Sequence, residues 1–126
     1  MFFMKITVVG AGYVGLSNSI LLAQNIPVIL FDIDKKKINN LKNKIPSIED
    51  KEIHSFLDDK NLQFTPTTNK KLAYKDAELV IIATPTNYDT VQNNFNTSSI
   101  EQVIEEALSF NLEVLFLIKS TVPVGY

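Results

Sequence analysis

Gly10-Ala11-Gly12-Tyr13-Val14-Gly15 follows an apolar run at residues 5–9 and opens a second apolar stretch. Its spacing is Gly-x-Gly-x-x-Gly, in which the first glycine permits a tight turn after a strand. The second glycine lets a pyrophosphate approach the backbone, and the third lets the following helix pack closely on the strand. Phosphate oxygens would then meet free N–H groups at the helix N-terminus. The stretch therefore predicts a strand–turn–helix unit that binds a dinucleotide.

A second apolar segment, Pro27–Phe31, ends at Asp32, twenty residues after Gly12. A carboxylate in this position accepts hydrogen bonds from the adenosine ribose hydroxyls. It would also repel a 2′-phosphate, so the sequence predicts NAD rather than NADP. Asp34 is expected to cap the next helix. The run Lys35-Lys36-Lys37 is interpreted as the solvated first turn of that helix, with an approach to the adenosine phosphates as the alternative.

Apolar segments alternate between strand-like and helix-like periods, which predicts an α/β fold with a Rossmann-like, doubly wound parallel sheet. The expected order is 3-2-1-4-5-6, truncated after about five strands. Residues 87–96 are expected to form a long polar loop, either a functional lid or a solvated connection. Strands are expected at 5–9, 28–31, 62–64, 79–83 and 114–118. The first two helices are expected at 12–24 and after Asp34, the second with Ile38, Leu41 and Ile45 on one face. A short third helix is expected around Ile53, Phe56 and Leu57, with a start near Ser47 and Asp50, and a short turn or helix at 72–74. The last helix is expected to begin at Ser98, because Ser98-x-x-Glu101 matches a capping box.

Composition limits the remaining possibilities. The 126 residues suit one domain with a real core, and a net charge of −2 gives no basic surface for nucleic acid. No apolar run approaches the roughly 20 residues of a membrane span. The chain has no cysteine and a single histidine, His54, in a polar stretch. These features predict no metal site, no nucleic-acid or membrane partner, and a cytoplasmic protein.

Two further segments leave strands at the edge where ligands bind in doubly wound folds. Residues 83–88, Ala-Thr-Pro-Thr-Asn-Tyr, follow the fourth expected strand, and residues 119–123, Lys-Ser-Thr-Val-Pro, follow the fifth. Threonine and asparagine side chains at such ends can bind ribose, amide or phosphate groups. The alternative is local turn formation, because Ser, Thr and Pro end strands routinely.

Taken together, the glycine motif, Phe31-Asp32-Ile33, residues 83–88 and residues 119–125 resemble the amino-terminal NAD-binding domain of the UDP-glucose/GDP-mannose dehydrogenase family. The resemblance covers essentially the whole chain, and Thr-Asn-Tyr favours the UDP-glucose branch. It implies NAD as cofactor and the oxidation of the C6 alcohol of UDP-glucose to a carboxylate with two NAD+. It implies that Thr121 lies near the nicotinamide and helps to position a catalytic water. The cofactor-binding residues that it implies are Gly10, Gly12, Tyr13, Val14, Gly15, Asp32, Lys37 (on the adenosine side), Thr84, Pro85, Thr86 and Thr121.

One departure from the family pattern concerns the chemistry. The family's oxidation passes through a thioester on a cysteine, and this chain has none. Residues 1–126 are therefore expected to be an NAD-binding domain that is incomplete, lacks the substrate domain and is inactive alone. The alternatives are a stand-alone dinucleotide-sensing module, the NAD-binding domain of another nucleotide-sugar dehydrogenase, or a dehydrogenase of hydroxyacyl or phosphogluconate type.

The fifth expected strand has a further consequence. Without a sixth strand, residues 113–118 would form an uncovered edge with apolar side chains and no helix on either face. Such an edge pairs readily with another chain, so self-association through this strand is expected. The alternative is that residues 121–126 fold back and shield the edge.

Overall fold

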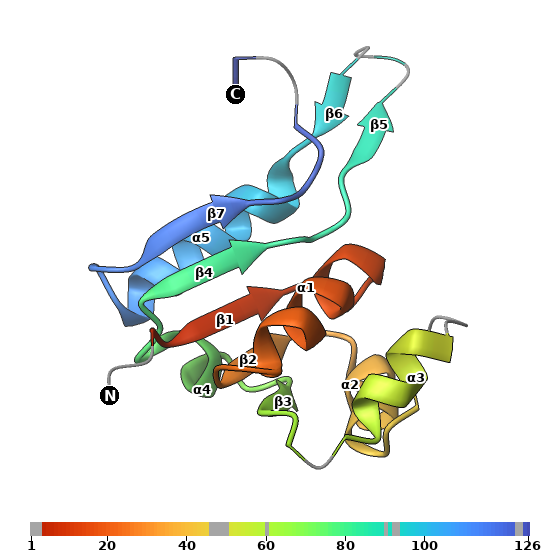
Figure 1. Ribbon diagram of the computed structural model, residues 1–126. Coiled ribbons are helices and arrows are strands. Elements are labelled where there is room, and N and C mark those ends of the chain that lie inside the picture. The colour runs from red at the N-terminus through yellow and green to blue at the C-terminus, as the bar shows by residue number, and fades with distance from the viewer. Residues whose placement is uncertain (1–3, 46–50, 60, 90, 92–93, 123–124) are drawn as a thin grey trace.

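The computed structural model describes residues 4–45, 51–59, 61–89, 91, 94–122 and 125–126 of the chain. Its centre is a sheet of five parallel strands in the order β3-β2-β1-β4-β7, which confirms the predicted doubly wound topology (Figure 1). Each neighbouring pair is in continuous register, and Val9 of the central strand lies beside both Phe31 and Ile82. The five strands are β1 (Ile6–Val9), β2 (Val28–Phe31), β3 (Phe64–Thr67), β4 (Leu79–Ile82) and β7 (Leu115–Ile118).

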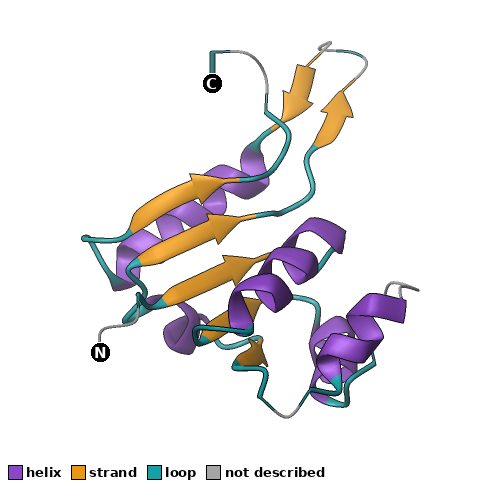
Figure 2. Cartoon of the chain, viewed as in Figure 1, coloured by secondary structure: helices purple, strands orange, loops and turns teal. Residues whose placement is uncertain are grey.

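Within the described residues, five helices cover the two faces of this sheet, with α1 in front and α5 behind it in the view of Figures 1 and 2. Side chains alternate along each strand, so neighbouring residues of β1 enter different cores. Ile6 and Val8 pack with α1, α2 and α3, whereas Val9 packs with α4 and α5. The three inner strands, β2, β1 and β4, are nearly all apolar because both of their faces are covered. The helices are α1 (Tyr13–Ala23), α2 (Lys35–Lys42), α3 (Lys51–Leu57), α4 (Lys70–Tyr74) and α5 (Ser98–Phe110).

The starts of α2 and α5 test the two predicted helix caps. Asp34 caps α2, because its Oδ1 accepts from the backbone N–H groups of Lys36 and Lys37 at 3.0 and 3.2 Å. This confirms the predicted cap. The capping box expected at Ser98 is wrong by one residue, since the N-cap of α5 is Thr97 and its side chain makes no cap hydrogen bond. The Thr97 hydroxyl instead donates to the Glu101 carboxylate at 2.9 Å.

Three other predictions need correction. The third strand runs over Phe64–Thr67 rather than residues 62–64, because the parallel register with β2 begins where Phe64 lies beside Val28. This strand is at the edge of the sheet, where a proline such as Pro66 is tolerated. Ile45 does not join the buried face of α2; it follows the end of the helix and is exposed. The start proposed for α3 near Ser47 and Asp50 lies outside the described residues.

The polar segment after β4 contains a hairpin where a loop was expected. The strands β5 (Asn87–Asp89) and β6 (Asn94–Asn96) pair antiparallel, with Asn87 beside Asn96. Figure 1 shows the hairpin beyond the carboxyl ends of β4 and β7, apart from the main sheet. The prediction missed it because three-residue strands are too short to show a hydrophobic period.

Strand β7 lies at the other edge of the sheet and pairs with β4 alone among the described strands. The expectation that both of its faces lack a helix is wrong for one face. Phe116 and Ile118 pack in the core beneath α5, because they continue the rows of Val80 and Ile82 on β4. On the opposite face, Leu115 and Leu117 are 64% and 48% exposed.

The end of the chain leaves this edge open in the part that the structure describes. Tyr126 lies beyond the carboxyl end of β7, and its hydroxyl is 3.3 Å from a carboxylate oxygen of Glu101 on α5 (Figure 1). Residues 123 and 124, which belong to the predicted fold-back, lie outside the described residues. None of the described helices is both long and apolar enough to cross a membrane.

Candidate dinucleotide-binding site

The glycine loop joins β1 to α1, and two of its glycines are required by close backbone contacts. Gly10 has φ of +109°, and a Cβ atom there would lie 2.6 Å from the Ala83 carbonyl oxygen. A Cβ atom on Gly15 would lie 1.7 Å from the Gly10 carbonyl oxygen. These two positions therefore exclude any side chain. They hold the start of α1 against the ends of β1 and β4.

Gly12 differs from these two glycines because a Cβ atom on it would meet no atom within 4 Å. It is the N-cap of α1, and the first intrahelical bond runs from the N–H of Leu16 to its carbonyl oxygen. The preceding N–H groups of the first turn have no partner within the helix. The space beside Gly12 and this helix start together form a cradle that suits an anionic group such as a pyrophosphate.

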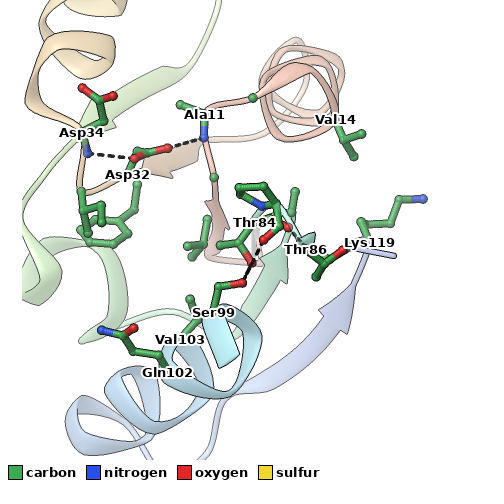
Figure 3. Close-up of a pocket in the computed structure, with 18 of the residues that line it drawn as sticks. Ala11, Val14, Asp32, Asp34, Thr84, Thr86, Ser99, Gln102, Val103 and Lys119 are labelled. Atoms are coloured by element: carbon green, nitrogen blue, oxygen red, sulfur yellow. Dashed lines mark hydrogen bonds between the residues drawn. The ribbon is translucent and has the colours of Figure 1, made fainter. Parts of the chain in front are cut away.

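Asp32 follows β2 and ties together the two loops beside it. Its Oδ2 accepts from the backbone N–H of Ala11 and its Oδ1 from that of Asp34, both at 2.8 Å (Figure 3). Each carboxylate oxygen has two lone pairs, so both oxygens retain capacity for a ligand hydroxyl. The residue thus holds the glycine loop in place and presents acceptors to the cavity.

The loops after β4 and β7 are bound to each other at the same edge of the sheet. The Thr86 hydroxyl donates to the Thr121 carbonyl oxygen at 2.7 Å, and the Ser120 hydroxyl donates to that of Thr84 at 2.7 Å. The Ser99 hydroxyl, on α5, donates to the Pro85 carbonyl oxygen at 3.1 Å. Because the single Ser99 hydroxyl proton is used in this bond, the Thr84 hydroxyl, 3.1 Å away, is the donor in the contact between Thr84 and Ser99.

A cavity of about 760 Å³ connects these three loops (Figure 3). Every residue predicted for cofactor binding lines it, except Gly15, which lies buried beneath the loop. The sequence prediction missed the fourth wall, which is α5. Its cavity-lining residues are spaced i, i+3, i+4 and i+7, a helical face that could have been recognised, although nothing local showed where it pointed. The lining residues outside the predicted cofactor-binding set include Ser99, Gln102, Val103 and Glu106 on α5, Phe31 at the end of β2, Ile33 and Asp34 after it, and Lys119 and Ser120 from the segment 119–123, which was predicted only to lie at this edge.

Charged groups are distributed unevenly around the cavity. Lys37, on the first turn of α2, is half-buried and lines the cavity near Asp34, whereas Lys35 and Lys36 are exposed. Lys119 lines the opposite side, after β7. Within the described segments, no three His, Cys, Asp or Glu residues lie close enough together to hold a metal ion.

One titratable group behind the cavity has a strongly altered environment. Tyr74 on α4 is fully buried, and its ring contacts that of Phe31, a cavity residue, with 5.5 Å between ring centroids. Burial raises the pKa of the Tyr74 hydroxyl well above its ordinary value, and the nearby Glu106 carboxylate raises it further. Tyr74 is therefore a neutral packing residue rather than an acid–base group.

The family model of the UDP-glucose/GDP-mannose dehydrogenase family, NAD binding domain, matches residues 4–126. The chain belongs to this family. It matches the region that contains the glycine loop, Asp32 and both strand-end loops, and it therefore forms the NAD-binding, Rossmann-like domain of a family of NAD-dependent dehydrogenases.

Individual relatives agree with this assignment. The chain is 45% identical over 125 residues to a UDP-glucose 6-dehydrogenase of Campylobacter jejuni and 43% identical over 123 residues to one of Streptococcus pneumoniae. Both alignments cover 98% of the chain but only 32% and 31% of the relatives. Among solved structures, a UDP-D-ManNAc dehydrogenase from Pyrococcus horikoshii superposes with a TM-score of 0.86 at 25% identity, over 97% of this chain and 29% of that one. The chain thus spans about a third of the length of its relatives.

Proposed function

We propose that the cavity binds NAD in an extended form across the carboxyl edge of the sheet, with the pyrophosphate at Gly12 and the start of α1. The support is the contrast among the glycines. Gly10 and Gly15 are needed for packing, whereas Gly12 opens onto free space beside unpaired helix N–H groups. The adenosine ribose is assigned to Asp32, with Lys37 beside it. Tyr13 and Val14, both exposed in the first turn of α1, line the cavity.

We assign the nicotinamide half to the joined loops after β4 and β7. Thr84, Pro85, Thr86 and Thr121 surround this end of the cavity, and the Thr86–Thr121 hydrogen bond fixes the distance between the loops. Bound NAD supplies a hydride acceptor, and the role of these residues is to hold the nicotinamide ring in place. Thr121 is exposed, so its hydroxyl remains available to orient a water molecule.

We propose further that the chain acts in the oxidation of UDP-glucose to UDP-glucuronate with two NAD+. This rests on the similarity to UDP-glucose 6-dehydrogenases and on the Thr-Asn-Tyr segment at 86–88. The present chain has no cysteine, so it cannot form the thioester through which the second oxidation would pass. Residues 1–126 are accordingly expected to bind NAD without oxidising the sugar.

Calorimetric titration tests the cofactor assignment, and an NADH absorbance assay tests the expected lack of sugar oxidation. The chain should bind NAD more tightly than NADP, because Asp32 opposes a 2′-phosphate. Mixing the chain with NAD and UDP-glucose should give no rise in NADH absorbance. Equal affinity for the two cofactors would contradict the Asp32 assignment. Steady NADH formation by the pure chain would contradict the thioester argument.

We also propose that the free edge of β7 pairs with a second copy of the chain. Antiparallel pairing centred on Phe116 would place Leu115 of one copy opposite Leu117 of the other. Extended at both ends, the same register would bring Glu113 beside Lys119 of the second copy, and both side chains are exposed. The edge is thus complementary to itself in both charge and apolar contact.

A further inference from the structure

The α5 wall of the cavity carries two polar side chains, Gln102 and Glu106, that are connected to Lys70 on α4 and have no role in the glycine loop or at Asp32. Lys70, on α4, places its Nζ 2.9 Å from Glu106 Oε1. Gln102 Nε2 donates to the same oxygen at 3.2 Å. Gln102 and Glu106 line the cavity. The ion pair fixes the Glu106 carboxylate between α4 and α5, and this carboxylate in turn fixes the Gln102 amide.

The chemistry of this pair determines which way the amide faces. An ionised carboxylate has only acceptors, so Gln102 must turn its NH₂ group toward Glu106. The carbonyl oxygen, Oε1, then remains for the cavity. Figure 3 shows Gln102 and Val103 on α5, across the cavity from Asp32 and Asp34. Gln102 is itself exposed, and its hydrogen bond to Glu106 orients the amide with the acceptor toward the cavity.

The part of the cavity that this acceptor faces has the lining expected for a flat apolar ring. With the ribose at Asp32, the attached base would extend between the end of β2 and α5. Ile33 and Val103 line this space from the two sides, and Ile33 is 78% exposed when nothing covers it. A base held between these two side chains would turn one polar edge toward Gln102.

We propose that Gln102 Oε1 accepts a hydrogen bond from the exocyclic amine of adenine and so makes the site selective for adenine dinucleotides. This inference rests on the proposed NAD-binding function. Adenine has a donor at its sixth ring position, whereas hypoxanthine has a carbonyl oxygen there, which would face the Gln102 oxygen as a second acceptor. Glu106 is a positioning residue, because it sets the orientation of the Gln102 amide without contacting the base.

The test is a calorimetric comparison of NAD with nicotinamide hypoxanthine dinucleotide on the chain of residues 1–126. NAD should bind about three- to tenfold more tightly, the range of one hydrogen bond between neutral groups. Gln102→Leu should remove this preference, because NAD loses a hydrogen bond and the hypoxanthine dinucleotide no longer faces a second acceptor. Glu105→Leu is the matched control on an exposed position of the same helix outside the cavity lining, and it should leave the ratio unchanged.

Glu106→Gln separates orientation from simple contact. A neutral amide at 106 can donate or accept, so Gln102 would lose its fixed orientation and the affinity ratio should shrink although Gln102 is still present. Melting temperatures show whether each variant is folded. Equal binding of the two dinucleotides by the unaltered chain would overturn the role of Gln102 while leaving the NAD site intact. If neither dinucleotide bound, the proposed function would fall, and this inference with it.

Discussion

At the scale of single residues, Asp32 combines two roles. Its two carboxylate oxygens accept backbone hydrogen bonds from Ala11 and Asp34, so the carboxylate positions the glycine loop that it borders. The same oxygens have lone pairs left for the ribose hydroxyls. Substitution of Asp32 will therefore act on the loop as well as on the ligand, and an experiment must separate the two effects.

Asp32→Ala should weaken NAD binding by about 1.5–3 kcal/mol, the cost of losing hydrogen bonds to a charged acceptor. It should also reduce the preference for NAD over NADP, since the repelling charge is gone. Asp32→Asn keeps one acceptor oxygen and the side-chain shape, so it should disturb the conformation of the glycine loop less than Asp32→Ala does. Calorimetry gives the affinities and thermal unfolding gives the stability. Unchanged NAD affinity in a folded Asp32→Ala protein would remove Asp32 from the site.

Substitution by alanine should have different effects at two glycines of the loop, on stability at Gly15 and on NAD binding at Gly12. Gly15→Ala should destabilise the fold by about 3 kcal/mol, because its Cβ would overlap the Gly10 carbonyl oxygen. Gly12→Ala should change stability by about 1 kcal/mol or less, since its Cβ meets no atom, but it should weaken NAD binding by occupying the cradle. Denaturant unfolding and NAD titration measure the two effects. Tight NAD binding by Gly12→Ala would argue against a pyrophosphate at this position.

At the scale of elements, the short helix α4 contributes through packing. Tyr74 lies between Phe31 of β2 and Phe110 of α5, with ring centroids 5.5 and 6.2 Å away. Its hydroxyl is buried and has no hydrogen-bond partner among the described residues. Tyr74 therefore anchors this five-residue helix together with buried Ala73 and the Lys70–Glu106 ion pair, and the buried hydroxyl adds a desolvation cost.

Tyr74→Phe should leave the stability unchanged or raise it by about 1 kcal/mol at neutral pH, because only an unsatisfied hydroxyl is lost. Its effect should depend on pH. Burial raises the pKa of Tyr74 in the folded state, so the folded protein holds its proton more tightly than the unfolded chain. This stabilisation is complete below the unfolded value of about 10 and is lost as the pH rises above it.

The loss of stability above pH about 10 should therefore be smaller in Tyr74→Phe than in the unaltered chain. Denaturant unfolding at a series of pH values measures this difference. Tyr13→Phe serves as the control, because Tyr13 is 59% exposed in the first turn of α1. A stability–pH profile of Tyr74→Phe that matched the unaltered chain would show that ionisation of Tyr74 is not coupled to unfolding.

At the scale of the whole molecule, the sheet has two different edges. Strand β3 contains Pro66 and has α2 beside it, and both features limit pairing with another chain. Among the residues that the structure describes, nothing pairs with the outer edge of β7, and its exposed face carries Leu115 and Leu117. Self-association should therefore occur through one edge only, which gives a closed dimer rather than a fibre.

Leu115→Lys should shift the chain from dimer to monomer in light scattering across a range of concentrations. Two lysines would face the apolar contacts of the symmetric edge, and lysine on an edge strand opposes pairing. Leu21→Lys on α1 is the matched control, because Leu21 is 65% exposed and lies away from this edge. If the unaltered chain stayed monomeric at high concentration, the proposed pairing of β7 with a second copy would be wrong.

The local sequence determined the strand order, the glycine loop and the position of Asp32. Apolar runs predict buried parallel strands, and the spacing of the glycines predicts a tight turn. The contact between Gly15 and Gly10 is local, whereas the contact that requires Gly10 is with Ala83 after β4. The Asp34 cap is equally local, since its partners are two and three residues away. The family resemblance depended on the same segments.

Only the tertiary structure decided how the cavity is closed. Thr86 and Thr121 are 35 residues apart, and Lys70 and Glu106 are 36 apart, yet both pairs are in direct contact. The periodicity of α5 indicated an amphipathic helix, but not that its polar face with Gln102 would form a wall of the cavity. Such contacts depend on how elements pack against one another, and the packing is set by the whole sheet rather than by any one segment.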